Sequence, residues 1–135
     1  MHVLCDTSFL MVIVSKPIKQ LSKMEAQLGR LDFLVPDIVI GELERLKEKA
    51  GPKRSTLAKT ALEVAEVKNF KVVAVAKAQH VDDSIIEYAI REKCAVATID
   101  TALRKRLIAN EVLVLTLSKD RLIIANPKLN PKDQI

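Results

Sequence analysis

Short apolar runs alternate with amphipathic stretches along most of this 135-residue chain, and that alternation restricts its fold more than any other feature. Residues 2–5, 31–35, 71–75 and 95–99 have the composition of strands, and stretches with helical periodicity lie between them. A chain that alternates strands and helices builds a mainly parallel sheet with helices on both faces. We therefore predict an α/β fold, a three-layer α/β/α sandwich around a mainly parallel central sheet.

Capping and turn residues set the expected boundaries of these elements. Asp6 and Asp100 each follow a strand and offer a side chain that caps the next helix, and Gly29 ends the helix before the second strand. The near-continuous apolar runs at 72–75 and 95–99 predict central strands, which are buried on both faces. Predicted helices follow Asp6, cover 18–28, 37–49 and 55–67, and begin again at 82–84 and after Asp100, while two last strands cover 112–117 and 121–125.

Length and composition favour one domain. A chain of this size buries enough surface for a single core, so we predict one domain over residues 1–125 and a flexible polar tail over 126–135. Cys5 and Cys94 lie far apart beside apolar runs, and we expect both to be buried reduced thiols of an intracellular protein. The apolar run at 9–14 is too short to cross a membrane and lacks a basic leader, so we expect a soluble, cytoplasmic protein with no membrane partner.

Two acids stand where predicted strands end. Asp6 follows the first strand, and Asp100 follows the strand at 95–99. Ligands of open α/β sheets bind outside the carboxyl ends of the strands, so this fold can bring the two side chains together. An aspartate after a strand also caps a helix without any further role, and that explanation suffices for either residue taken alone.

Glu42 is placed among the apolar residues of a predicted helix. Residues three and four positions away on a helix share its face, and for Glu42 these include Ile38 and Leu46. A carboxylate on such a face needs a cation or hydrogen-bond donors. Glu42 therefore either faces a cation site or lies at the edge of the apolar face, where it reaches water or pairs with Arg45 or Lys49.

Asp82 and Asp83 stand together at a predicted helix start, and only one of them needs to face a shared site. Helical periodicity does not choose between them, and either also serves as a cap. Hydroxyl side chains stand beside the acids at Thr7, Ser8 and Thr98. They would orient a water or a carboxylate, and a role in capping or packing is equally consistent with their positions.

Basic residues stand near these acids. The chain has a net charge of +5, which favours contact with the phosphates of nucleic acids, although many basic proteins never bind them. A solvated basic face accounts for these residues as well as an RNA-binding surface does. With one tyrosine, three phenylalanines and no tryptophan, the chain would recognise RNA by shape and backbone more than by base stacking. The candidates for RNA contact are Lys53, Arg54, Arg104, Lys105 and Arg106.

Four carboxylates gathered at one place need a cation. They repel one another at neutral pH unless a metal ion neutralises them, and oxygen ligands suit Mg²⁺ or Mn²⁺. Such ions support the hydrolysis of phosphodiester bonds. Zinc fits less well, because neither the two cysteines nor the two histidines cluster with ligand spacing. An acidic metal site in a basic chain therefore indicates a metal-dependent nuclease.

Segments 4–8, 35–43, 82–86 and 97–100 together resemble the PIN-domain ribonucleases, and they occur in the family's order within residues 1–117. The resemblance implies a three-layer α/β/α fold, a Mg²⁺ or Mn²⁺ site and cleavage of single-stranded RNA. It favours Asp83 over Asp82, because small and apolar residues follow Asp83. The catalytic residues and metal ligands that it implies are Asp6, Glu42, Asp83 and Asp100. We expect the residues beside these acids to support them, namely Thr7, Ser8, Asp82 and Thr98.

Within the family, the sequence looks closest to the branch that processes ribosomal RNA, and the VapC toxin branch is the alternative. One departure is Ala102, where some members carry a further acid, and it leaves open whether one metal ion is bound or two. A non-catalytic RNA-binding assembly module with the same fold is a further alternative. The resemblance implies RNA as a partner, single-stranded or structured, a homodimer as a candidate assembly, and an antitoxin or a ribosome-assembly factor as candidate protein partners.

Overall fold

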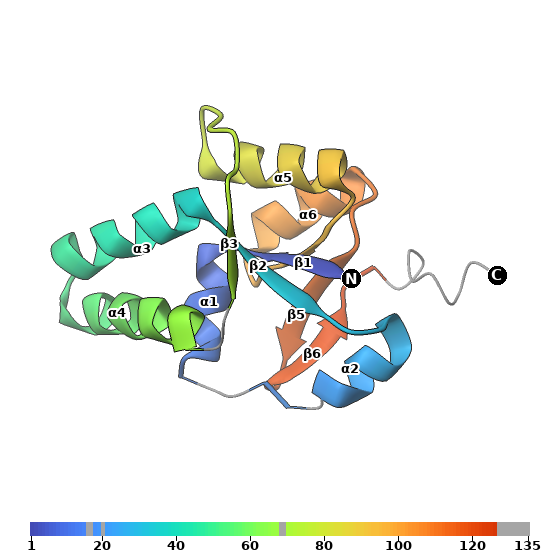
Figure 1. Ribbon diagram of the computed structural model, residues 1–135, viewed down its shortest axis with the longest axis horizontal. Helices are drawn as coiled ribbons and strands as arrows, with labels where there is room; N and C mark the ends of the chain where they lie inside the picture. Colours follow the sequence, from blue (N-terminus) through green and yellow to red (C-terminus); the bar gives the residue numbers. More distant parts are fainter. Residues whose placement is uncertain (16–17, 20, 68–69, 127–135) are drawn as a thin grey trace.

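The structure, a computed structural model, describes residues 1–15, 18–19, 21–67 and 70–126 (Figure 1). Residues 127–135, most of the tail predicted for 126–135, lie outside the described residues. Asn126 is described, and its side chain bonds to the backbone at the start of β5 (Val114–Ser118). It accepts a hydrogen bond from Val114 N–H at 2.9 Å and donates one to the Val112 carbonyl at 2.7 Å.

A six-stranded sheet has the strand order β3-β2-β1-β4-β5-β6. Neighbouring strands from β3 to β5 are parallel, and only β6 runs antiparallel to its neighbour β5. The order reverses between β1 and β4, which makes that position the topological switch point where ligands of open α/β sheets bind. The strands are β1 (His2–Cys5), β2 (Asp32–Pro36), β3 (Lys71–Val73), β4 (Ala95–Ala97), β5 (Val114–Ser118) and β6 (Arg121–Ile124).

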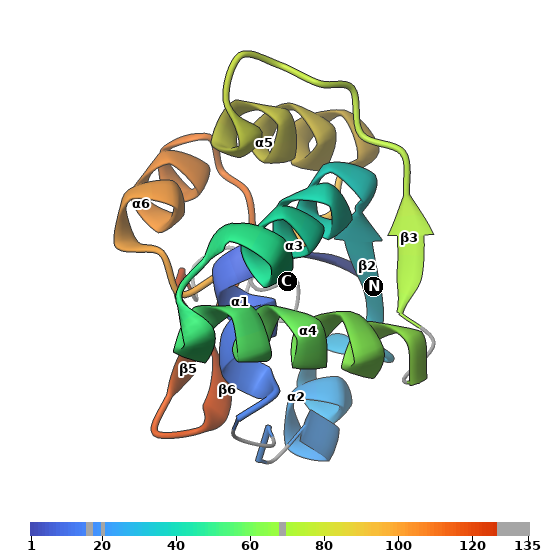
Figure 2. The ribbon, with the colours of Figure 1, turned by 90° about the vertical axis from the view of Figure 1, so that its left-hand side faces the viewer.

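Two groups of helices pack beside this sheet. Helices α1, α3 and α4 contact one another and lie to the left in Figure 1, whereas α5 and α6 contact each other and lie above. Figure 2 shows the first group facing the viewer, and α2 contacts the edge strand β6. The predicted α/β/α fold is confirmed. The helices are α1 (Thr7–Ile13), α2 (Leu21–Leu28), α3 (Asp37–Lys49), α4 (Pro52–Val67), α5 (Val81–Glu92) and α6 (Thr101–Ala109).

The apolar core lies where the helices cover the sheet. All three residues of β4 are buried, as predicted for a central strand. The same prediction for 72–75 was wrong, because β3 ends at Val73, forms one edge of the sheet and leaves Val72 54% exposed. An apolar run indicates a strand but not its place in the sheet, since the order of strands depends on the crossover connections.

Some boundaries differ from those expected. Helix α2 begins at Leu21 and not at 18, since Lys19 forms a parallel bridge with Arg121 beside β6. Helix α4 begins at Pro52, three residues earlier than predicted, because a helix tolerates proline in its first turn. None of the helices that the structure describes has both the length and the apolar character of a membrane span. Cys5 and Cys94 are buried free thiols, as expected.

Candidate active site

The site forms where β1 and β4 end side by side. Cys5 pairs with Ala97 in the sheet, and Asp6 N–H donates to the Ala97 carbonyl at 3.2 Å, so Asp6 leaves the sheet next to Thr98. Asp6 is the N-cap of α1 and is 5% exposed. Asp100 is the N-cap of α6. The expectation that the fold brings the two strand ends together is confirmed.

Hydrogen-bond donors surround the Asp6 carboxylate. Its Oδ1 accepts a bond from Phe9 N–H at 2.8 Å, and its Oδ2 accepts one from the Thr98 hydroxyl at 2.5 Å. The Ser8 hydroxyl lies 2.9 Å from Oδ1 and 3.0 Å from Oδ2, in reach of both. A carboxylate taken from water needs such partners, so the two hydroxyl residues and the helix cap together hold Asp6 in one orientation.

The same hydroxyls tie the segment 98–100 to α1. Thr98 Oγ1 accepts a hydrogen bond from Asp100 N–H at 3.0 Å, and Ser8 Oγ accepts one from Ile99 N–H at 3.3 Å. Asp100 in turn accepts a bond from Leu103 N–H at 3.0 Å through Oδ1. One network therefore fixes Asp6 and the backbone of Asp100 relative to each other.

The carboxyl groups influence one another electrostatically. Burial raises the pKa of Asp6 above its ordinary value, the hydrogen bonds from Thr98, Phe9 and Ser8 oppose that rise, and the charge of Asp100 adds to it. Burial also raises the pKa of Asp82, again with the charge of Asp100 as a further cause. Asp6 and Asp82 thus both lie within the field of Asp100.

A pocket of about 180 Å³ joins these side chains. Glu42 lines it from α3 and is half-buried. Its carboxylate makes no hydrogen bond or ion pair with another described residue. The structure therefore does not show the alternative of a pair with Arg45 or Lys49. The hydroxyl of Thr7 is buried beside it without a hydrogen-bond partner in the described part of the chain. The pocket is lined by Asp6, Thr7, Ser8, Met11, Glu42, Arg54, Val81, Asp82, Ile85 and Asp100.

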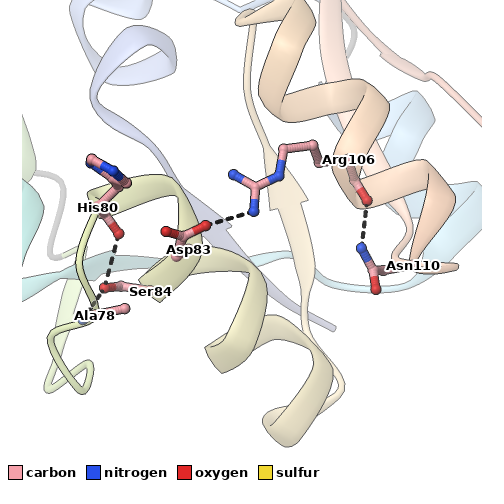
Figure 3. A network of polar contacts seen from close by, with 6 residues as sticks. All are labelled: Ala78, His80, Asp83, Ser84, Arg106 and Asn110. Atoms are coloured by element: carbon pink, nitrogen blue, oxygen red, sulfur yellow. Dashed lines mark hydrogen bonds and ion pairs between the residues drawn. The ribbon is translucent and has the colours of Figure 1, made fainter.

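Asp83 does not face this pocket. It accepts a hydrogen bond of 2.6 Å from Arg106 Nη2, and this bond lowers the pKa of the Asp83 carboxyl (Figure 3). Successive residues on a helix point about 100° apart, so Asp82 shares the face of Ile85 while Asp83 shares that of Ile86. The structure therefore brings Asp82 to the other acids in place of Asp83, which had been expected there on the resemblance.

Of the predicted RNA-binding residues, one lines the acid pocket and the others lie outside it. Arg54, in the first turn of α4, lines the acid pocket, whereas Lys53, Arg104 and Lys105 lie outside it. Arg106 binds Asp83 and lines another pocket. Sequence reasoning missed the apolar wall, Met11, Val81 and Ile85. The helical spacing of Ile85 from Asp82 was a signal for it, but Ile86 stands at the same spacing from Asp83, so the pattern did not decide.

The donor set fits a hard divalent cation. Four carboxylates and two hydroxyls line a space many times larger than one water needs, so an ion fits together with waters that it retains. As they stand, no three His, Cys, Asp or Glu side chains of the described residues are arranged to hold an ion directly. Mg²⁺ keeps several waters and often takes only one or two carboxylates, so ligation partly through water needs no such group.

The fold is an open α/β sheet, and four carboxylates line a pocket at its switch point. This combination is typical of metal-dependent hydrolases of the α/β class. Residues 3–120 match the family model described as "PIN like domain", and the chain therefore belongs to the PIN-like domain family, as its sequence motifs predicted. Among characterised relatives, it is 28% identical to Ribonuclease VapC4 of Methanocaldococcus jannaschii over 118 residues, which cover 86% of this chain and 89% of the relative.

Solved structures share the fold. The structure of the PIN domain endonuclease Utp24 matches with a TM-score of 0.73 and 23% identity, over 92% of this chain and 90% of that one. A domain of a functionally unknown protein from Methanocaldococcus jannaschii matches with a TM-score of 0.61 and 20% identity, over 87% and 91% of the two chains. The named relatives are nucleases, so the chain belongs to a family with nuclease members.

Proposed function

We propose that this protein is a divalent-metal-dependent endoribonuclease that hydrolyses phosphodiester bonds of RNA. The observation that carries the proposal is the pocket in which Asp6, Glu42, Asp82 and Asp100 converge from four separate parts of the chain. Unpaired carboxylates gathered in this way cost free energy unless a cation joins them. The 28% identity to a relative named a ribonuclease supports RNA as the substrate.

These four acids would hold Mg²⁺ or Mn²⁺, with Asp82 in the place first assigned to Asp83. When bound, a divalent ion supplies Lewis-acid chemistry, because it acidifies a water and offsets the charge on the departing oxygen. Thr98 and Ser8 hold the carboxylate of Asp6 in position through the hydrogen bonds that they donate. The partnerless hydroxyl of Thr7 orients the attacking water, and the guanidinium of Arg54 binds a phosphate oxygen of the substrate.

The test is cleavage of RNA by the purified protein with Mn²⁺, beside the Asp6→Asn and Asp100→Asn variants. We expect cleavage that requires the ion, stops with EDTA, and falls at least about a hundredfold in each variant, because each removes a charged ligand. Circular dichroism of the variants serves as the folding control. Unchanged cleavage in both variants would mean that another site performs the reaction.

Within this activity, we propose processing of the ribosomal RNA precursor in the cytoplasm as the biological role. The similarity to Ribonuclease VapC4 favours a toxin role as the second candidate. Mapping of cleavage sites on total cellular RNA separates the two. Cuts confined to precursor rRNA support the first role. Growth arrest on expression, relieved by a small protein encoded beside this one, supports the second.

A non-catalytic RNA-binding assembly module is a further candidate. It is favoured by Ala102, two residues after Asp100, and by the lack of a preformed three-ligand group in the described residues. Such a module would bind RNA in a salt-dependent manner, with no metal-stimulated cleavage of any substrate. Assembly as a homodimer suits either activity, and sedimentation measures it directly.

A further inference from the structure

A second groove adjoins the acid pocket. It lies between α3 and the segment that links β3 to α5, and its volume is about 320 Å³. Glu42 and Val81 line both the groove and the acid pocket, so the two hollows lie side by side. The groove is lined by Ile38, Gly41, Glu42, Arg45, Lys77, Ala78, Gln79, Val81 and Ser84.

Hydrogen bonds hold the outer wall of the groove in place. Val75 N–H donates to Asp37 Oδ1 at 3.1 Å, which ties the start of the wall to the first residue of α3. Ala78 N–H donates to the buried hydroxyl of Ser84 at 2.8 Å, and that hydroxyl donates to the His80 carbonyl at 3.4 Å (Figure 3). The wall is therefore fixed at two points before any ligand binds, which lowers the entropic cost of binding.

The lining combines apolar and cationic groups. Ile38, Ala78 and Val81 are half-buried, while Arg45 and Lys77 are exposed and form no ion pair with a described residue. An apolar interior with a few polar groups at its rim is typical of small-molecule sites, and its volume lies at the lower end of their range. A nucleotide also combines two such parts: its flat base suits the apolar interior, and its charged phosphate suits the cations at the rim.

We propose that this groove binds one unpaired nucleotide of the RNA, next to the bond that the acid pocket cleaves. The proposal rests on the proposed ribonuclease function and adds to it the place that holds the nucleotide beside the cleaved bond. The base would enter against Ile38 and Val81, and Arg45 and Lys77 would bind the adjoining phosphates. A base that is stacked and paired within a duplex cannot enter a pocket of this kind.

The test measures binding of a fluorescent single-stranded RNA in EDTA, where metal-dependent cleavage cannot occur, as a function of salt. The groove variant is Arg45→Gln with Lys77→Gln. The matched control is Lys23→Gln with Arg121→Gln, which removes the same two charges from a pocket of about 360 Å³ between α2 and β6. We expect the groove variant to bind about tenfold more weakly and to lose about 0.7 from the salt slope for each contact. We expect the control to stay within about twofold.

A third variant separates shape from charge. A Cβ atom built at Gly41 meets nothing within 4 Å, so a side chain has room to begin there, and Gly41→Leu adds bulk to the groove wall while it keeps both cations. It should weaken binding to single-stranded RNA without changing the salt slope. None of the groove and Gly41 variants should differ from the unaltered protein on a fully paired duplex.

The outcomes separate the two proposals. Metal-dependent cleavage with equal RNA binding by the groove variant and its control would overturn the groove and leave the ribonuclease intact. An equal loss on duplex and on single-stranded RNA would overturn the unpaired nucleotide as its ligand. If the unaltered protein neither binds nor cleaves RNA, both proposals fail together.

Discussion

Asp6 and Asp83 show how differently one fold treats two carboxyl groups. Asp6 is buried, accepts hydrogen bonds from a helix cap and two hydroxyls, and has a raised pKa because burial outweighs those bonds. Asp83 lies near the surface, pairs with Arg106 at 2.6 Å and has a lowered pKa because of that bond. The Asp83 carboxyl already has its cation within the protein. Asp6 forms no ion pair with a basic side chain of the described residues and lies in the field of another acid, an arrangement that is common among carboxylates at functional sites.

The contrast is sharpest between neighbours in the sequence. Asp82 and Asp83 occupy the first turn of α5, yet burial and Asp100 raise the pKa of Asp82, whereas Arg106 lowers that of Asp83. One step along the helix rotates the side chain from the acid pocket to the face that meets α6. A chemical difference between two identical residue types thus arises from orientation alone.

The largest expected effect compares these two neighbours. In RNA cleavage with Mn²⁺, we expect Asp82→Asn to lower kcat/KM at least about a hundredfold, because it removes a charge from the pocket. Asp83→Asn should change it by less than about threefold, since only an exposed pair is lost. Steady-state kinetics of the two variants measure this. A larger loss for Asp83→Asn would show that Asp83 is the ligand, as the family motif implied.

The second prediction concerns metal binding without catalysis. At a Mn²⁺ concentration about a hundred times the dissociation constant, the ion should stabilise the protein by about 2.7 kcal/mol, which raises Tm by on the order of 10 °C. Thermal melts with Mn²⁺ and with EDTA measure this shift. It should persist in Asp83→Asn and vanish in Asp100→Asn, and an equal shift in both variants would place the bound ion elsewhere.

A third prediction tests the donors around Asp6. Thr98→Val keeps the shape of the side chain but removes the 2.5 Å bond to Asp6 and the acceptor of Asp100 N–H. We expect a loss of about 1–3 kcal/mol in urea unfolding, and an acid limb of the cleavage profile that moves to higher pH because the pKa of Asp6 rises further.

Thr116→Val is the matched control for that variant. Thr116 is also buried in the sheet, 5% exposed, and its hydroxyl makes no hydrogen bond with another described residue. Its replacement should leave the pH profile unchanged. If both valine variants shift the profile alike, the effect comes from general packing and not from the bond to Asp6.

The smallest effect concerns the pH dependence of stability in EDTA. Since the pKa of Asp6 is above the ordinary 3.8, the folded state binds its proton more tightly than the unfolded chain does, and this contribution favours folding as pH falls toward 3.8. The pKa of Asp83 is lowered, so its contribution is present above the ordinary value and is lost below it. Melts of Asp6→Asn and Asp83→Asn against the unaltered protein from neutral to acid pH should show differences of opposite sign.

Much of the fold followed from local patterns. Asp6 and Asp100 were expected to cap helices after strands, and both do so through hydrogen bonds to the third residue of the helix. The helix predicted from Asp37 to about Lys49 agrees with α3, because Pro36 precedes it and the Gly51-Pro52 pair follows it. The place of the strand at 71–73 was not predicted, because burial of a strand depends on which neighbours the crossovers bring to it.

The candidate site, like the fold, was predictable where local patterns determine it. Glu42 was noticed because it lies on an apolar helical face, and Asp6 and Asp100 because they follow strands that share one edge of a parallel sheet. Nothing local distinguishes Asp82 from Asp83, and nothing local predicts that Arg106 binds one of them from another helix. The groove beside Glu42 was not anticipated either, since Arg45 and Lys77 are 32 positions apart in the chain and meet only through the packing of α3 beside the segment before α5.

The sequence by itself determined the alternation of strands and helices, the caps, the family and three of the acids that line the pocket. Each of these depends on residue types and spacings within a few neighbouring positions. Only the tertiary structure decided that Asp82 joins those acids, that Asp83 forms an ion pair with Arg106, and that a second groove lies beside Glu42. The physical reason is that burial, ion pairing and pocket shape arise between elements distant in the chain, where helix rotation and packing choose among side chains that look alike locally.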